Sequence, residues 1–232
     1  DALMVATMDT KDKTINVMNI PRDTMCNNTA TGASKKINAA YGMDTGGKGG
    51  NIEQTSKEIE RLMGFRPDKY VIVNFDGIAA IVDAIGGVDY DVPFDMKYDD
   101  PSQNLHIDLK KGQQHLDGKQ TVGFLRWRHN NDYTVQYTNG DEGRVENQQK
   151  FLKALAGQVL QIKNVTKIRS IAEAVFKNVK TDFSAGELLW MGMQAMQIDN
   201  SSIQFFTLPG YGKMSTAGTS VQYSFFFPYY DQ

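Results

Sequence analysis

The sequence holds a single cysteine, Cys26, and three histidines, and its formal net charge is only -2. One cysteine excludes an internal disulfide, and it fits either a reducing compartment or a bacterial exterior where disulfides are sparse. The charge balance argues against a general nucleic-acid surface, because such surfaces need a broad positive excess. No run approaches the roughly 20 apolar residues that span a bilayer, so we expect a soluble chain. Any anion site must therefore be local.

Motifs of several common site classes are also missing. His106, His115 and His129 lack the spacing of a metal site, and Ser34 lies in no G-x-S-x-G elbow. The glycines of residues 46–50 have neither the spacing nor the preceding strand of a phosphate-binding loop. Zinc, serine-hydrolase and P-loop chemistry are therefore poor explanations of this chain.

The length of 232 residues, with 41% apolar residues, suits one domain that covers residues 1–232. The chain begins abruptly inside the apolar run LMVATM, with no turn or cap before it. We therefore expect a fragment of a longer protein, whose first strand has lost its upstream context.

Segments with the hydrophobic spacing of strands and segments with that of helices alternate along the chain. Strands are expected at residues 3–8, 14–20, 70–75 and 88–92. Helices are expected at residues 52–63, 76–85 with Asp76 as the cap, 117–126, from 144 onward, 165–179 and 184–198. This order predicts the α/β class: a three-layer α/β/α sandwich with a central mixed β-sheet and helices on both faces.

Four arginines stand where an oxygen-rich ligand could reach them. Arg22 follows a proline at a strand end, where open α/β sheets present their ligand crevice. Arg126 and Arg128 flank a tryptophan at a helix end. Arg144 and Gln148, four residues apart, share a helix face. Each also has an ordinary alternative: a surface turn, a cation at the negative helix pole, or a solvated face. Arginine forks match phosphate oxygens in pairs. If the fold brings these side chains together, a pyrophosphate site is predicted.

Five ordered segments resemble the LytR-CpsA-Psr family of bacterial cell-wall enzymes. They are NIPRDT (19–24), KKINAAYG (35–42), YVIVNFDGIAAIVDAIGGVDYDVP (70–93), LKKGQQHLDGKQTVGFLRWR (109–128) and DEGRVENQQ (141–149). The resemblance implies a phosphotransferase that moves a glycopolymer, such as teichoic acid or capsular polysaccharide, from a polyprenyl-(pyro)phosphate carrier to peptidoglycan. The product is a phosphodiester.

The resemblance also implies roles for particular residues. Pyrophosphate would be held by Arg22, Arg126, Arg128, Arg144 and Gln148. The opening DALM is similar to the remainder of a family R-S-D-T-M pattern, which makes Asp1 a ligand of magnesium, or of manganese. Asp1, Arg22, Arg126 and Arg128 are the expected catalytic residues. Since the arginine of that pattern and a second, upstream aspartate are absent from the chain, the chain by itself is expected to be inactive.

The family's lipid carrier occupies an apolar pocket between sheet and helices. In this chain one strand and the helix after it offer more apolar surface than a thin layer needs, so we predict a cavity between these residues or their neighbours. The residues are Val71, Val73, Phe75, Ile78, Ile81, Val82 and Ile85. An ordinary hydrophobic core is the alternative for each of them. The polar segment 129–143 is longer than the usual family connection, and it is interpreted either as a mobile loop at the mouth of the site or as an idle insertion.

The family resemblance places the protein at the extracellular face of the bacterial cytoplasmic membrane or in the cell wall. The domain is expected without its N-terminal strand and upstream membrane anchor, which makes the chain a soluble ectodomain. Its partners would be the lipid-linked glycopolymer and peptidoglycan, with no nucleic acid. Two alternatives stay open: a hydrolase that cuts the same lipid pyrophosphate with water, and a non-catalytic binder of polyprenyl lipids or wall glycans.

Overall fold

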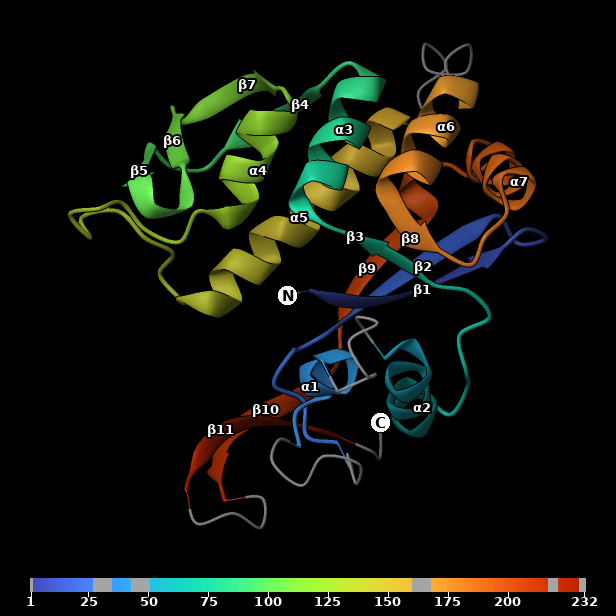
Figure 1. Ribbon diagram of the computed structural model, residues 1–232, viewed down its shortest axis with the longest axis horizontal. Coiled ribbons are helices and arrows are strands. Elements are labelled where there is room, and N and C mark those ends of the chain that lie inside the picture. The colour runs from blue at the N-terminus through green and yellow to red at the C-terminus, as the bar shows by residue number, and fades with distance from the viewer. Residues whose placement is uncertain (1, 27–34, 43–50, 160–167, 217–220, 230–232) are drawn as a thin grey trace. The chain divides into compact units, whose positions relative to one another are not determined.

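The computed structural model describes residues 2–26, 35–42, 51–159, 168–216 and 221–229 (Figure 1). The chain divides into two compact units. Unit 1 consists of residues 1–9, 15–68 and 204–232, and unit 2 of residues 10–14 and 69–203. Each unit is described on its own below, and the assignment of residues 1–232 to one catalytic domain stays a prediction.

Unit 1 is built around a three-stranded sheet in the order β1-β2-β9. Its strands and helices are β1 (Leu3–Asp9), β2 (Thr14–Ile20), α1 (Ile37–Gly42), α2 (Ile52–Met63), β9 (Ile203–Thr207), β10 (Gly210–Ser215) and β11 (Tyr223–Pro228). Strands β10 and β11 pair antiparallel. The buried apolar side chains of Val5, Ile20, Ile37, Ile59 and Leu208 form one core cluster.

The ends of α2 follow local rules. The Asn51 side chain accepts a hydrogen bond from the backbone of Gln54 at 2.9 Å, which caps the first turn. Gly64 ends the helix with a φ of 77°, in the left-handed region that glycine adopts without steric cost. The expected helix at residues 52–63 is therefore confirmed.

Unit 2 combines three antiparallel strand pairs with five helices among its described residues. The pairs are β3 (Val71–Val73) with β8 (Val179–Thr181), β4 (Val88–Val92) with β7 (Gly112–Leu116), and β5 (Met96–Asp100) with β6 (Leu105–Leu109). The helices are α3 (Phe75–Ile85), α4 (Gly118–Arg126), α5 (Asp141–Val159), α6 (Ile168–Asn178) and α7 (Ala185–Ala195). In the described part of the chain, no helix is long and apolar enough to cross a membrane.

Helix α3 lies between α4 and α6 (Figure 1). The contact with α4 is close at Gly118, where an added Cβ would lie 2.3 Å from the carbonyl oxygen of Ala79. The rings of Tyr90, Phe124 and Phe151 contact one another at centroid distances of 5.0 to 5.2 Å. This aromatic cluster belongs to the main core of unit 2 and joins β4, α4 and α5.

Alternating strands and helices confirm the predicted α/β class. The hairpin of β1 and β2, strand β4 and helix α4 also agree with the sequence pattern. The expected strand at 70–75 is wrong at its end, because α3 already begins at Phe75 and Asn74, rather than Asp76, caps it by accepting from the Gly77 backbone at 2.8 Å. Strands β5, β6 and β7 were missed because their sequence resembled a polar connection.

Candidate functional site

The two arginines of the GFLRWRH segment lie at the end of α4. That helix begins with a capping box, in which Asp117 and Gln120 each accept from the other's backbone N–H. It ends at Arg126, and Trp127 follows as a fully buried side chain that contacts Phe94 and Tyr137. Burial of the tryptophan leaves its two arginine neighbours toward solvent.

Arg126 is half-buried and has neutral partners. Its Nη2 donates a hydrogen bond to Oε1 of Gln103 at 2.6 Å, and its guanidinium carbon lies 5.3 Å from the centre of the Phe75 ring. Arg128 is exposed. Among the residues that the structure describes, neither arginine forms an ion pair with a carboxylate. The two guanidinium groups therefore carry positive charge that no described carboxylate neutralises.

Helix α5 meets this end of α4 through Gln148. The Gln148 Nε2 donates to the backbone oxygen of Leu125 at 2.9 Å, one residue before Arg126. This bond also satisfies a carbonyl in the last turn of α4, which has no partner within its own helix. The structure thus joins α5, which carries the R-x-x-x-Q pattern of Arg144 and Gln148, to the end of α4, where the R-x-R pattern of Arg126 and Arg128 begins. Convergence of the arginines on one ligand stays a prediction.

A buried polar bridge holds α5 in this position. The Nδ2 of Asn147 donates to the hydroxyl oxygen of Tyr137 at 2.7 Å, and the Tyr90 hydroxyl donates to Asn147 Oδ1 at 3.1 Å. Burial raises the pKa of both tyrosines to about 12, while the Asn147 bond and the positive charge of Arg144 act to lower that of Tyr137. Both tyrosines are therefore neutral at physiological pH, and Arg144 lies within electrostatic reach of Tyr137.

Arg22 lies in unit 1, in the turn that follows β2. The backbone and hydroxyl of Thr24 both donate to the Pro21 oxygen, at 2.9 and 2.6 Å, which fixes this turn. The Arg22 Nε lies 4.0 Å from a carboxylate oxygen of Asp23, and the other oxygen of Asp23 pairs with Lys36 at 2.9 Å. Since Arg22 and the remaining four site residues belong to different units, convergence of all five stays a prediction.

The structure gives no position for the expected metal ligand. Asp1 lies outside the described residues. Across the described ranges, no group of three or more His, Cys, Asp and Glu side chains could hold a metal ion.

Val82 and Ile85, two of the expected lipid-pocket residues, belong to the core, with Ile78 packed against it, and Ile81 is half-buried. Val71, Val73 and Phe75 are instead exposed by 49%, 39% and 46%, and of these Phe75 lies against the Arg126 guanidinium. The lipid pocket itself stays a prediction.

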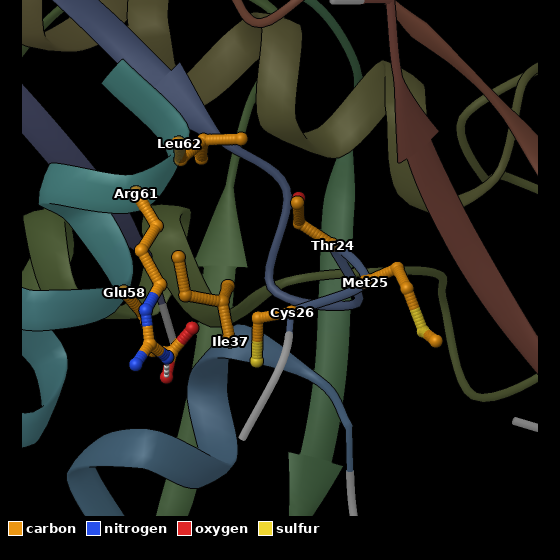
Figure 2. A pocket seen from close by; sticks show the side chains of 7 residues that line it. All are labelled: Thr24, Met25, Cys26, Ile37, Glu58, Arg61 and Leu62. Atoms are coloured by element: carbon orange, nitrogen blue, oxygen red, sulfur yellow. Dashed lines mark hydrogen bonds and ion pairs between the residues drawn. The ribbon is translucent and has the colours of Figure 1, made fainter. Parts of the chain in front are cut away.

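Unit 1 contains a pocket of about 400 Å³ that the sequence did not indicate. It is lined by Thr24, Met25, Cys26, Ile37, Glu58, Arg61 and Leu62 (Figure 2). Glu58 is buried and accepts hydrogen bonds from Gln54 at 2.8 Å and from Arg61 at 2.7 Å, the latter drawn as a dashed line. A glutamate next to Ile59 on the apolar face of α2 was the available signal for this pair.

Segment 129–143 was interpreted either as a mobile loop at the mouth of the site or as an idle insertion, and its first residues are bonded to β5. Its backbone bonds to β5, since Asn131 N donates to the Lys97 oxygen at 3.3 Å, and the Asn130 side chain accepts from Lys97 N at 2.6 Å. The same Asn130 oxygen accepts from the Trp127 indole at 3.1 Å. The segment is therefore anchored to the strand pair β5–β6 and to the residue between the two arginines.

Comparison with known proteins agrees with these motifs. The sequence profile described as the LytR_cpsA_psr family matches residues 1–225. The chain is 36% identical over 211 residues to the polyisoprenyl-teichoic acid–peptidoglycan teichoic acid transferase TagV of Bacillus subtilis (strain 168), covering 88% of this chain and 51% of TagV. It is 32% identical over 183 residues to the corresponding transferase TagU of Halalkalibacterium halodurans, covering 78% of this chain and 54% of TagU. The chain thus spans about half the length of the curated relatives it matches.

Solved structures share the fold. The crystal structure of B. subtilis TagV superposes with a TM-score of 0.77 at 32% identity, covering 99% of this chain and 83% of that one. A LytR-Csp2A-Psr enzyme from Actinomyces oris gives a TM-score of 0.73 at 17% identity, covering 99% of this chain and 80% of that one, a likeness of fold alone. The α/β architecture therefore extends over nearly the whole chain.

Proposed function

The chain belongs to the LytR-CpsA-Psr family, and from this premise we propose that it is a phosphotransferase that links a glycopolymer to peptidoglycan. The donor is a teichoic acid, capsular or other wall polysaccharide on a polyprenyl-(pyro)phosphate carrier. The product is a phosphodiester between the polymer and a peptidoglycan hydroxyl. The names of the transferases TagV and TagU support this choice of donor and acceptor.

The observation that carries the proposal is the contact of α5, through Gln148, with the end of α4 that bears Arg126. Arg126 is the last residue of α4, Arg128 follows two residues later, and Gln148 of α5 bonds to the backbone of Leu125. The negative pole of α4 favours nearby cations, yet like charges repel, and no described carboxylate pairs with either arginine. An anion with several oxygens, such as a pyrophosphate, satisfies both groups.

The proposed reaction asks little covalent chemistry of the protein. The acceptor oxygen forms a bond to the phosphorus that carries the sugar, and the bond from this phosphorus to the bridging oxygen breaks. The polyprenyl phosphate leaves with the electron pair of that bond, and the proton of the acceptor hydroxyl passes to a carboxylate, for which Asp1 is our candidate. Arg22, Arg126, Arg128 and Arg144 neutralise the charge that develops on the phosphate oxygens, so electrostatics and positioning supply the rate.

Magnesium, or manganese, is proposed as the cofactor on the family resemblance. When bound, the ion adds positive charge at the pyrophosphate. The described residues do not form a metal site by themselves, and Asp1 is our candidate ligand.

The carrier lipid and the membrane complete the proposal. Exposed Phe75, whose ring contacts the Arg126 guanidinium, begins an apolar surface that continues to Val73 and Val71. A lipid chain that leaves a pyrophosphate at Arg126 would reach this surface first. We place the protein at the extracellular face of the cytoplasmic membrane, held by an N-terminal membrane anchor.

Incubation of the protein at its full natural length with a lipid-linked glycopolymer and peptidoglycan oligomers tests the function. We expect a covalent adduct whose mass equals the acceptor plus the phosphopolymer, together with released polyprenyl phosphate. Release of free phosphopolymer without adduct would mean a hydrolase, and an unchanged donor would mean a binding module. Either result overturns the transferase.

A further inference from the structure

Three aromatic rings form a ladder in unit 2 immediately after Arg128. The ring of Tyr98 on β5 meets the ring of His129 edge-on, with centroids 5.7 Å apart. Tyr133 stacks on His129 at a centroid distance of 4.0 Å and an interplanar angle of 20°. Tyr98 and His129 are half-buried, while Tyr133 at the end of the ladder is 63% exposed. One face of Tyr133 is therefore covered by His129, and its exposed area lies elsewhere on the ring.

The backbone beneath the ladder is tied down from several sides. The Asn131 side chain makes two hydrogen bonds to the backbone of Asp99, one accepted at 2.7 Å and one donated at 3.0 Å. Asn130 donates to the Asp95 oxygen at 3.2 Å and accepts from Lys97 N at 2.6 Å. In Figure 1 this segment runs beside β5, between α4 and α5. The ladder is thus presented on a strand edge, which lowers the entropic cost of binding.

The backbone of Tyr133 adopts a conformation that is unfavourable for an aromatic residue. Its φ of 59° lies in the left-handed region, where a bulky aromatic residue is rare. Asp132 helps to impose it, because its carboxylate accepts from the backbone and hydroxyl of Thr134 at 3.1 and 2.8 Å. A largely exposed ring regains little of that cost through burial. Backbone strain of this kind concentrates at ligand clamps and other functional sites.

We propose that the ladder of Tyr98, His129 and Tyr133 is a sugar-binding platform, with Tyr133 stacking on one ring of a glycan. This inference rests on the proposed function and adds to it a subsite. A pyranose ring has an apolar face of C–H groups and a rim of hydroxyls, so an exposed, rigid aromatic ring fits its face. Arg128 directly precedes His129, and in the described part of the chain it has no hydrogen-bond or ion-pair partner.

The chemistry of the reaction agrees with this adjacency. A sugar is bonded directly to the reacting phosphate in the donor, and a sugar hydroxyl attacks that phosphate from the acceptor. Either glycan therefore brings a sugar ring next to the arginines. The platform starts one residue after Arg128, so phosphate and sugar can bind side by side.

The test separates ring stacking from folding. Asparagine tolerates the left-handed region, so Tyr133→Asn removes the ring and suits the backbone. Two soluble probes are titrated by calorimetry into the parent and the variant: peptidoglycan glycan strands freed of peptide, and the lipid-free glycopolymer. We expect the variant to bind at least one probe about 5- to 10-fold more weakly, as for loss of one aromatic contact. The weakened probe identifies whether the acceptor or the donor sugar occupies the platform.

Two control variants accompany this measurement. Tyr133→Phe keeps the ring and should bind within about twofold of the parent, since stacking needs no hydroxyl. Trp190→Ala removes another exposed aromatic, on α7, and should leave both affinities unchanged. Equal affinities of parent and Tyr133→Asn for both probes, or no measurable binding to the parent, would overturn the platform, as would an equal loss in Trp190→Ala or in Tyr133→Phe. The titration involves no transfer, so failure of the transferase proposal would appear separately, as absence of the covalent adduct.

Discussion

Replacement of Arg126 by alanine tests the anion site most directly. In the resting protein this guanidinium donates to Gln103 and lies over the Phe75 ring, and both partners are neutral. An exposed cation–π contact contributes about 0.5–1 kcal/mol and one hydrogen bond about 1 kcal/mol. The variant should therefore lose only about 1–2 kcal/mol of unfolding free energy. Since domains commonly have about 5–15 kcal/mol, it stays folded.

The same substitution should affect transfer far more strongly. An arginine fork on a phosphate makes two charge-assisted bonds, each contributing about 1.5–3 kcal/mol. Loss of about 3–6 kcal/mol of transition-state stabilisation lowers kcat/KM by about 10²- to 10⁴-fold. We expect this fall in the adduct assay, together with weaker binding of inorganic pyrophosphate in a calorimetric titration.

The matched control is Gln103→Ala, which removes the resting partner of Arg126 and keeps the charge. It should transfer polymer within about threefold of the parent rate, because Gln103 is neutral and contributes no charge toward the phosphate. Thermal unfolding of both variants checks that they are folded. If Arg126→Ala transfers within threefold of the parent, or if Gln103→Ala is equally impaired, then Arg126 does not act on the phosphate and our reasoning fails.

Three further outcomes are expected. Asn147→Ala removes two hydrogen bonds and leaves two tyrosine hydroxyls without this partner, so urea unfolding should show a loss of about 2–4 kcal/mol; an unchanged midpoint would contradict the bridge. Hydrogen bonds from Ser184 and Lys69 lower the pKa of Glu187 from 4.5 to about 2. The ionised Glu187 therefore contributes fully to the free energy of unfolding above pH 4.5, and this contribution is lost as the pH falls toward 2. The free energy of unfolding of Glu187→Gln should thus depend less on pH between 2 and 4.5 than that of the parent. If the two curves of unfolding free energy against pH are parallel, Glu187 does not make this contribution. Asp1→Ala should weaken binding of Mg²⁺ in a calorimetric titration at full natural length, and equal affinity would remove Asp1 as the ligand.

Local rules explain the helix ends that the sequence predicted correctly. Gly64 ends α2 and Asp117 caps α4, because a left-handed glycine and a short acceptor side chain act within one turn of chain. The same kind of rule was applied to the wrong residue at the start of α3. Asp76 was expected as the cap, but Asn74, directly after β3, accepts from the Gly77 backbone.

The strands between β4 and α4 were harder to predict. Leu105, Ile107 and Leu109 alternate with polar residues and are buried, as expected for a strand with one buried face. Their pairing with β5 depends on a turn at Pro101–Gln103 and on a core supplied mainly by other elements. Neither is visible in a short window of sequence, so the segment resembled a polar connection.

By itself, the sequence determined which functional groups the protein can bring to an anion. These are the two arginines around a tryptophan, the arginine and glutamine of the R-x-x-x-Q helix, and the ordered motifs of a family. Those features are sets of residue types at fixed spacings, and spacing along one helix or turn follows from backbone geometry alone. Only the tertiary structure decided that Trp127 is buried, that Gln148 reaches the carbonyl of Leu125, and that segment 129–140 is held against β5. These contacts join residues that are distant in the chain, and their formation depends on burial and hydrogen bonding in the folded core rather than on local preference.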